Sequence, residues 1–217
     1  MRPLPADPIA AAMGSLAGPG PDSDELRAQA RADEDAAERR RYGRLRPDHP
    51  AAGGRREPTT AARADRGGVM TVLAAYAIIA YLTGEPAAPS VADLLRQPDV
   101  DCCIATPNVT EVVDVLVRGR GQDVEDVLEK LDWLAAAGLL TVPADDSIAR
   151  AAGRIRSAHY RRVDAPVSLA DCLTLATAQV LGHALATADP DLGRVAASVG
   201  IEVIALPDAS GRLPRSS

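Results

Sequence analysis

The sequence contains no phenylalanine and a single lysine, Lys130, among its 217 residues. Aromatic residues make up 2% of the chain and hydrophobic residues 47%, so any core must be built mainly from aliphatic side chains. The bias toward alanine and arginine is typical of a GC-rich genome and says nothing about function. A chain of this length and apolar content can bury one substantial core, with residues left over for an appendage.

The chain also lacks excess positive charge, paired cysteines and long apolar runs. A net charge of -6 and a pI of about 5.1 exclude a broad basic face, so any contact with nucleic acid must be local. Cys102, Cys103 and Cys172 have neither metal-ligand spacing nor the density of a disulfide framework, and we expect buried, reduced thiols. No stretch approaches the ~20 apolar residues of a membrane span, and no signal peptide is recognisable. These features predict a cytoplasmic protein without membrane contact.

Composition divides the chain after residue 69. Residues 1–69 are rich in Pro, Gly, Ala and Arg, which predicts a largely irregular extension. One helix is expected within it, at about 23–42, with Asp22 as N-cap, Glu25 three residues later and basic Arg39–Arg41 at its end. Its interior holds few large apolar groups, so the helix should be marginal alone and should fold fully only when docked.

From Met70 onward, short apolar strands alternate with helices, one of which we expect Ser90 to cap. This alternation predicts a parallel sheet covered on both faces. The expected fold is a three-layer α/β/α sandwich with a central, mainly parallel sheet over residues 70–207, followed by a tail at 208–217. The expected strands are Thr71–Leu73, Cys102–Ala105, Leu139–Val142, His183–Ala186 and Ile201–Leu206.

Four acidic residues lie near expected junctions between a strand and the following helix: Glu111, Asp171, Asp189 and Asp191. In parallel sheets such positions gather at the carboxyl edge, where ligands bind. Each acid alone is also explained by the helix dipole, which favours carboxylates near helix starts by ~0.3–1 kcal/mol. Together they would repel one another unless a cation or an arginine neutralised them. A hard divalent cation, Mg²⁺ or Mn²⁺, suits such a site, and that chemistry suits phosphodiester hydrolysis.

Four short motifs carry a specific resemblance. Met70–Ala77 resembles the opening of a PIN-domain ribonuclease of the VapC toxin type, from type II toxin–antitoxin systems. Asn108–Val112, Ser168–Cys172 and Ala186–Leu192 resemble the later acidic motifs of that family, in order and with ordinary spacing. The resemblance covers about residues 70–207, and it implies a PIN-like fold, an RNA substrate, a Mg²⁺ or Mn²⁺ cofactor, a homodimer and a cognate antitoxin.

The resemblance also assigns roles to individual residues. It implies that Glu111, Asp171 and Asp189 are catalytic metal ligands, with Asp191 as an accessory ligand. Thr187 would orient these acids or the substrate. By position beside the acidic motifs, Arg118 and Arg161 are candidates for holding the RNA backbone, although exposed arginines are ordinarily just solvated.

The departure from the family pattern is Ala74, because the family has an aspartate there that bridges or orients the metal. A methyl group cannot coordinate a cation, so the resemblance predicts absent or impaired turnover. Two origins stay open: a deliberate inactivating substitution, or a natural degenerate copy. The competing function is a non-catalytic PIN-fold protein that binds RNA or a partner. A phosphatase-like hydrolase would need a nucleophilic aspartate after the first strand, and Ala74 argues against it.

The extension has a resemblance of its own. Ser23–Leu45 resembles the C-terminal segment of a VapC-type antitoxin, which lies in the acidic groove and can insert an arginine into the site. The partner of the acidic groove would then be a cognate antitoxin or the chain's own N-terminal segment. The DNA-binding half of an antitoxin is absent. Residues 1–69 are accordingly a native fusion, an antitoxin fragment, a solvated tail or a start upstream of a true initiator at Met70.

Overall fold

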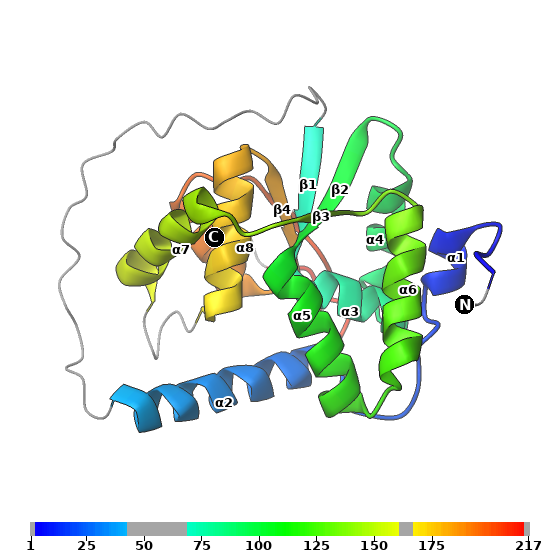
Figure 1. The fold of residues 1–217 in the computed structure, drawn as a ribbon, viewed down its shortest axis with the longest axis horizontal. Helices are drawn as coiled ribbons and strands as arrows, with labels where there is room; N and C mark the ends of the chain where they lie inside the picture. Colours follow the sequence, from blue (N-terminus) through cyan, green and yellow to red (C-terminus); the bar gives the residue numbers. More distant parts are fainter. Residues whose placement is uncertain (1–2, 43–68, 161–166, 215–217) are drawn as a thin grey trace.

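A computed structural model describes residues 3–42, 69–160 and 167–214. Within these residues a five-stranded sheet has the order β3-β2-β1-β4-β5, and all four strand pairings are parallel (Figure 1). The strands are β1 (Val69–Leu73), β2 (Val100–Ala105), β3 (Leu140–Val142), β4 (Ala184–Thr187) and β5 (Val203–Ala205). The predicted parallel sheet is confirmed.

The sheet has a topological switch point beside its first strand. The chain passes from β1 to β2 and β3 on one side and then returns to β4 and β5 on the other. Leu73 pairs with Ala186 at the carboxyl ends of β1 and β4. The crevice outside these ends is where open α/β sheets bind ligands.

Helices cover both faces of the sheet, so the predicted three-layer sandwich is confirmed (Figure 1). Two apolar clusters, one on each face, form the core. The first involves α3 (Ala75–Thr83), α4 (Ala88–Arg96), α5 (Thr106–Asp114), the π-helical turn η1 (Val115–Gly119) and α6 (Val124–Ala136). The second involves α7 (Asp146–His159), α8 (Leu169–Leu181) and α9 (Pro190–Ser198).

One predicted cap is wrong. Helix α4 has Ala87 at its N-cap and begins at Ala88, so Ser90 lies inside the helix. Pro89 explains the earlier start, because proline favours the first turn of a helix, where its missing N–H needs no partner.

Within the described residues before the sheet, 3–42, the chain forms two helices, α1 (Pro8–Ala12) and α2 (Ser23–Tyr42). The backbone N–H of Glu25 donates to Asp22 and the N–H of Asp22 donates to Glu25, which is the reciprocal cap expected from the sequence. Helix α1 was not expected, although Asp7 caps it and Pro8 opens it. It is too short for a periodic apolar pattern to reveal it.

Residues 7–26, which we call the anchor segment, belong to the core of the domain. Ile9, Ala12, Leu16 and Leu26 are buried in the same apolar cluster as α3 and α6. The N–H groups of Gly14 and Leu16 also donate to the carbonyls of Tyr81 and Leu82, each at 2.9 Å. These carbonyls lie in the last turn of α3, where the Tyr81 carbonyl also accepts from the C-cap Gly84 N–H at 3.3 Å. The anchor segment therefore completes that helix end.

Polar contacts hold the end of the anchor segment. Glu85 accepts hydrogen bonds from the backbone N–H and the hydroxyl of Ser23, the former at 3.0 Å. Arg120 donates to the carbonyls of Gly18 and Pro21 at 2.9 and 3.0 Å, and lies 3.5 Å from Glu85. The start of α2 is therefore fixed from two sides.

The three cysteines are buried and unpaired, as predicted. Burial raises the pKa of Cys102 and of Cys172 to about 11, so these thiols stay protonated. Among the described residues, none of the helices combines the length and the apolar character that crossing a membrane would require.

Candidate functional site

Helix starts carry two of the predicted acids to the carboxyl edge of the sheet. Asp171 lies in the first turn of α8, where its carboxylate accepts from the backbone N–H of Ser168 at 2.8 Å. In return, the backbone N–H of Asp171 donates to the hydroxyl of Ser168 at 2.9 Å. Asp189 is the N-cap of α9 and accepts from the Asp191 N–H at 2.9 Å. Both carboxylates are thereby fixed by the backbone, which makes the site rigid.

Thr187 is buried at the end of β4 and positions the next acid. Its hydroxyl oxygen accepts from the backbone N–H of Asp189 at 3.0 Å. Asp189 itself is 3% exposed, which makes it the one buried acid among the described residues. This contact fixes the backbone of Asp189 at the end of β4.

Arg31 of α2 reaches this acidic edge from far away in sequence. Its guanidinium donates to Asp189 through Nη2 and to Asp191 through Nη1, the latter at 3.3 Å. Nη2 also lies 4.0 Å from an oxygen of Asp171. One positive charge therefore faces three of the four predicted acids.

The electrostatics of the pair follow from burial and mutual charge. Burial alone would lower the pKa of Arg31, but the charges of Asp189, Asp171 and Asp191 outweigh that effect and raise it. Burial raises the pKa of Asp171 to about 6, with the charge of Asp189 adding to the shift and Arg31 opposing it. The carboxylates thus repel one another, and the positive charge of Arg31 offsets part of that repulsion.

Glu111 lies in the second turn of α5, beside the other acids. Burial raises the pKa of Glu111 to about 8, and the nearby charge of Asp171 adds to the shift. Glu111 and Asp171 line a cavity of about 370 Å³ together with Arg31 and Tyr76. The Tyr76 hydroxyl is buried without a hydrogen-bond partner in the described structure, which leaves an oxygen available at this wall.

Ala74 follows β1 directly and is the N-cap position of α3. It is 4% exposed and packs with Met70 and Val72 in the apolar cluster on the α8 face. Its N–H donates to the carbonyl of Ala186 at 3.1 Å, so the backbone at this corner is tied to β4. A carboxylate at position 74 would start from the same corner of the sheet as Asp189.

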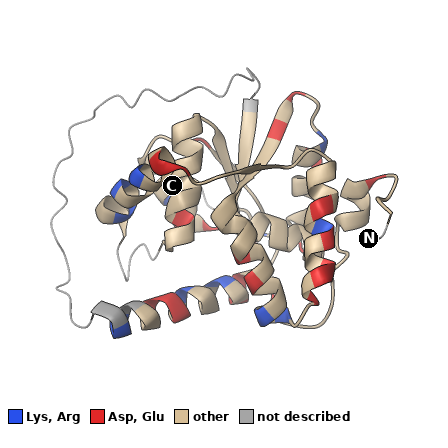
Figure 2. Cartoon of the chain, viewed as in Figure 1, with Lys and Arg blue, Asp and Glu red and all other residues tan. Residues whose placement is uncertain are grey.

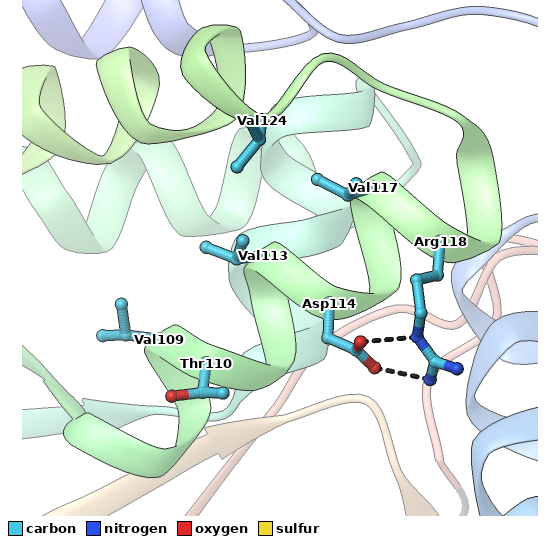
Figure 3. A pocket seen from close by; sticks show the side chains of 7 residues that line it. All are labelled: Val109, Thr110, Val113, Asp114, Val117, Arg118 and Val124. Carbon is cyan, nitrogen blue, oxygen red and sulfur yellow. Dashed lines mark hydrogen bonds and ion pairs between the residues drawn. The ribbon is translucent and has the colours of Figure 1, made fainter.

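Of the two arginines considered for RNA contact, Arg118 is engaged elsewhere. It is bound by Asp114 one turn earlier, with its Nε and Nη2 at 2.5 and 2.7 Å from the two carboxylate oxygens (Figure 3). This pair borders an apolar hollow of about 450 Å³ on the outer side of α5, lined by Val109, Val113 and Val117. Arg161 lies outside the described residues.

The donor set fits a hard divalent cation. Carboxylate oxygens are the ligands that Mg²⁺ prefers, and three of them already converge on a positive group, the Arg31 guanidinium. In this conformation no cluster of three or more Asp, Glu, His or Cys side chains within residues 3–42, 69–160 and 167–214 is arranged to hold a metal ion. The carboxylates face Arg31 instead.

The sequence did not single out two contacts of α2. Arg31 was not identified, and Glu34 accepts from the Leu169 N–H at 3.1 Å and from Arg156 at 3.3 Å. Figure 2 shows acidic and basic residues mixed along α2. The spacing of Arg27, Arg31 and Glu34 puts them on one helix face, which is the available signal. That pattern does not reveal which surface the face meets.

The chain belongs to the PIN domain family. The family model matches residues 72–198, more than half of the chain and the whole acidic edge described above. The PIN fold predicted from the four motifs is therefore confirmed. No curated protein matches this sequence.

Three solved structures are similar in fold. VapBC2 from Rickettsia felis, bound to a DNA fragment from its promoter, has a TM-score of 0.50 at 14% identity, covering 63% of this chain and 98% of that one. FitAcB from Neisseria gonorrhoeae has a TM-score of 0.45 at 23% identity, covering 62% and 96%. FitAB bound to an IR36 DNA fragment has a TM-score of 0.46 at 20% identity, covering 62% and 94%.

Proposed function

We propose that this chain is a metal-dependent endoribonuclease toxin of the VapC type, impaired by Ala74 and covered by its own N-terminal segment. The observation that carries the proposal is the meeting of Asp171, Asp189 and Asp191 on one cation at the switch point of a PIN-domain sheet. Mutually repelling carboxylates need a positive group between them, which is Arg31 in this structure and a divalent cation in the proposed active site.

In this proposal Asp171, Asp189 and Glu111 hold Mg²⁺ or Mn²⁺, with Asp191 as an accessory ligand. When bound, such an ion supplies an activated water and offsets charge on the phosphoryl oxygens of RNA. Thr187 keeps Asp189 oriented through its backbone N–H. The backbone caps of α8 and α9 hold the carboxylates in place before the ion arrives, which limits the entropy lost on binding.

Ala74 removes one charged ligand from this set. Fewer charged ligands lower the affinity for a divalent ion, so we expect binding at about millimolar concentration. Turnover should fall by orders of magnitude, comparable to losing an electrostatic element worth ~3–4 kcal/mol.

Arg31 stands where the ion would be, and we infer that it keeps the acids neutralised while the site is closed. This use of the chain's own segment corresponds to the antitoxin-like role suggested by Ser23–Leu45. A cognate antitoxin acting in trans, an RNA substrate and a homodimer belong to the same proposal.

A second function, a PIN-fold protein that binds RNA or a partner without cutting, is favoured by one observation. Position 74 holds a buried methyl group packed in an apolar cluster. A site kept for binding alone does not need the ligand that this position lacks.

Restoring the missing ligand separates the two functions. The variant Ala74→Asp, combined with Arg31→Gln to open the site, should cleave RNA in a Mg²⁺- or Mn²⁺-dependent manner that a chelator abolishes. It should also arrest growth on expression. The experiment uses the full chain, because removing residues 1–69 would remove Ile9, Leu16 and Leu26 from the core.

The matched control adds Asp171→Asn to the same two changes. The amide keeps the shape of the side chain but removes the charge that holds the ion, so this triple variant should be inert. If the double variant is folded and binds metal yet leaves a broad panel of RNAs uncut, the ribonuclease proposal is wrong and the binding function replaces it.

A further inference from the structure

Helix α2 is attached to the domain in two physically different ways. Its first turn belongs to the anchor segment, and Ser23 and Leu26 are buried there. From residue 27 to residue 42, which we call the cover segment, no described side chain is buried. In Figure 1 the blue helix α2 starts near α5 and runs away from it along the lower edge of the view.

The cover segment holds to the domain by polar contacts. Arg31 meets the three carboxylates, and Glu34 meets Arg156 and the first N–H of α8. Arg27 lies over the ring of Tyr76, 5.7 Å from its centre. The residues between these side chains, such as Ala28, Gln29 and Ala32, are exposed. Ala30 is only half-buried, so apolar burial contributes little to holding the described side chains of the cover segment on the domain.

The charge balance at the Arg31 contact is incomplete. Arg31 faces Asp171, Asp189 and Asp191, and the more exposed Arg194 pairs with Asp191 at 2.5 Å. Two positive charges against three carboxylates leave the closed site with an excess of negative charge. A divalent ion carries twice the charge and takes several carboxylate oxygens at once, whereas a monovalent salt ion only screens. Arg31 and a divalent ion need the same oxygens and exclude each other.

We propose that divalent cations open this protein: Arg31 gives up its carboxylates to the ion, and the cover segment leaves the domain while the anchor segment stays in place. The inference rests on the proposed metal site and adds a mode of regulation to it. The chain then carries a permanently attached inhibitor whose release depends on divalent ion concentration and needs no proteolysis.

The anchor segment makes this opening reversible. Ile9, Leu16 and Leu26 stay in the core, and Glu85 and Arg120 hold the residues just before and at the start of α2. The cover segment consequently remains tethered at its first turn and rebinds intramolecularly when the ion is removed. A tethered segment acts at a high effective concentration, so weak polar contacts are enough to close the site.

The test measures a distance in the full chain. Spin labels are placed at Ala37→Cys on α2 and Ala149→Cys on α7, both exposed, while the native cysteines are buried and should stay unlabelled. On titration with MgCl₂ the distance between the labels should lengthen and its distribution broaden, and a chelator should reverse the change. NaCl at matched ionic strength should have a much smaller effect.

Two variants and one second label pair sharpen the test. Arg31→Gln should be open without the ion, whereas Arg39→Gln, which removes the same charge from an arginine paired with Asp35 inside α2, should respond like the parent. A label at Ala10→Cys on α1 should keep its distance to Ala149 throughout.

The outcomes separate this inference from the proposed function. If calorimetry shows Mn²⁺ binding to the labelled parent while the distance stays fixed, the opening mechanism is wrong and the metal site stands. If the Arg31→Gln variant is open yet binds no Mn²⁺, the metal site itself is wrong, and the opening mechanism fails with it. If both label pairs move together, the division between anchor and cover is wrong.

Discussion

The two parts of the N-terminal region differ in what holds them. The anchor segment, residues 7–26, is buried apolar structure that completes the end of α3. The cover segment, residues 27–42, lies on the acidic edge through Arg31 and Glu34. Buried apolar contacts offer no charge for an ion to compete for, whereas charge contacts at a partly exposed edge are screened by ions and can be replaced by them. One continuous helix thus passes from a part held by apolar burial to a part held by charge contacts.

The largest effect should come from cutting into the anchor segment. Leu26→Ala removes a side chain that is 4% exposed and should lower the free energy of unfolding by about 2–4 kcal/mol. Urea unfolding followed by Trp133 fluorescence measures the change. Gln29→Ala, an exposed change on the cover segment, should stay within about 0.5 kcal/mol. Equal effects of the two substitutions would erase the distinction between the segments.

Stability should next depend on pH through the acidic edge. Burial and nearby charge raise the pKa of Glu111 from 4.5 to about 8 in the folded chain. A raised acid pKa means that the folded state holds the proton more tightly, so this contribution is full below pH 4.5 and is lost as the pH rises toward 8. The free energy of unfolding should therefore fall by about 1–3 kcal/mol over that range.

Glu111→Gln is the matched variant for this pH dependence, because it keeps the neutral form of the side chain. Its free energy of unfolding should vary less between pH 5 and pH 8.5 than that of the parent. Urea unfolding at a series of pH values provides the comparison. A variant curve with the parent's slope would mean that Glu111 does not titrate in this range.

The smallest change in the free energy of unfolding should come from substituting Glu34, which lies in the cover segment and makes no contact in the core. Glu34→Gln weakens the contacts with Arg156 and with the N–H of Leu169, and partly exposed pairs of this kind contribute about 0–1 kcal/mol. Global stability should barely change. Hydrogen exchange of residues 27–42 should become faster while exchange of residues 7–26 stays as in the parent. Faster exchange in both ranges would show that they open as one unit.

Much of the fold and of the acidic site was predictable from the sequence, and the features that were not predicted depend on long-range packing. The cap at Asp22 is local, and its pattern predicted a helix start that the structure has. The acids were found because parallel topology sends strand ends to one edge. Burial of the anchor segment is a long-range packing effect, and Ile9 and Leu16 are too few and too widely spaced to form a periodic pattern.

Arg31 shows the same limit for the site. Its place on one face of α2 was predictable, but three other arginines follow in Arg39–Arg41 and nothing local distinguishes them. Only docking of the helix selects the residue that meets Asp189. The predicted cap at Ser90 was wrong for a local reason. Ser90 and Pro89 are competing signals for a helix start, and Pro89 determined where α4 begins.

Titration calorimetry with Mn²⁺ on the full chain and on Arg31→Gln tests most directly the claim that Arg31 occupies a divalent metal site. The parent should bind Mn²⁺ weakly, at about millimolar concentration, because the ion must displace the guanidinium and lacks a ligand at position 74. Arg31→Gln should bind at least about tenfold more tightly, equivalent to ~1.4 kcal/mol. Asp171→Asn in the same background should weaken that binding again. Equal Mn²⁺ affinities for the parent and Arg31→Gln, or no binding by either, would contradict the claim.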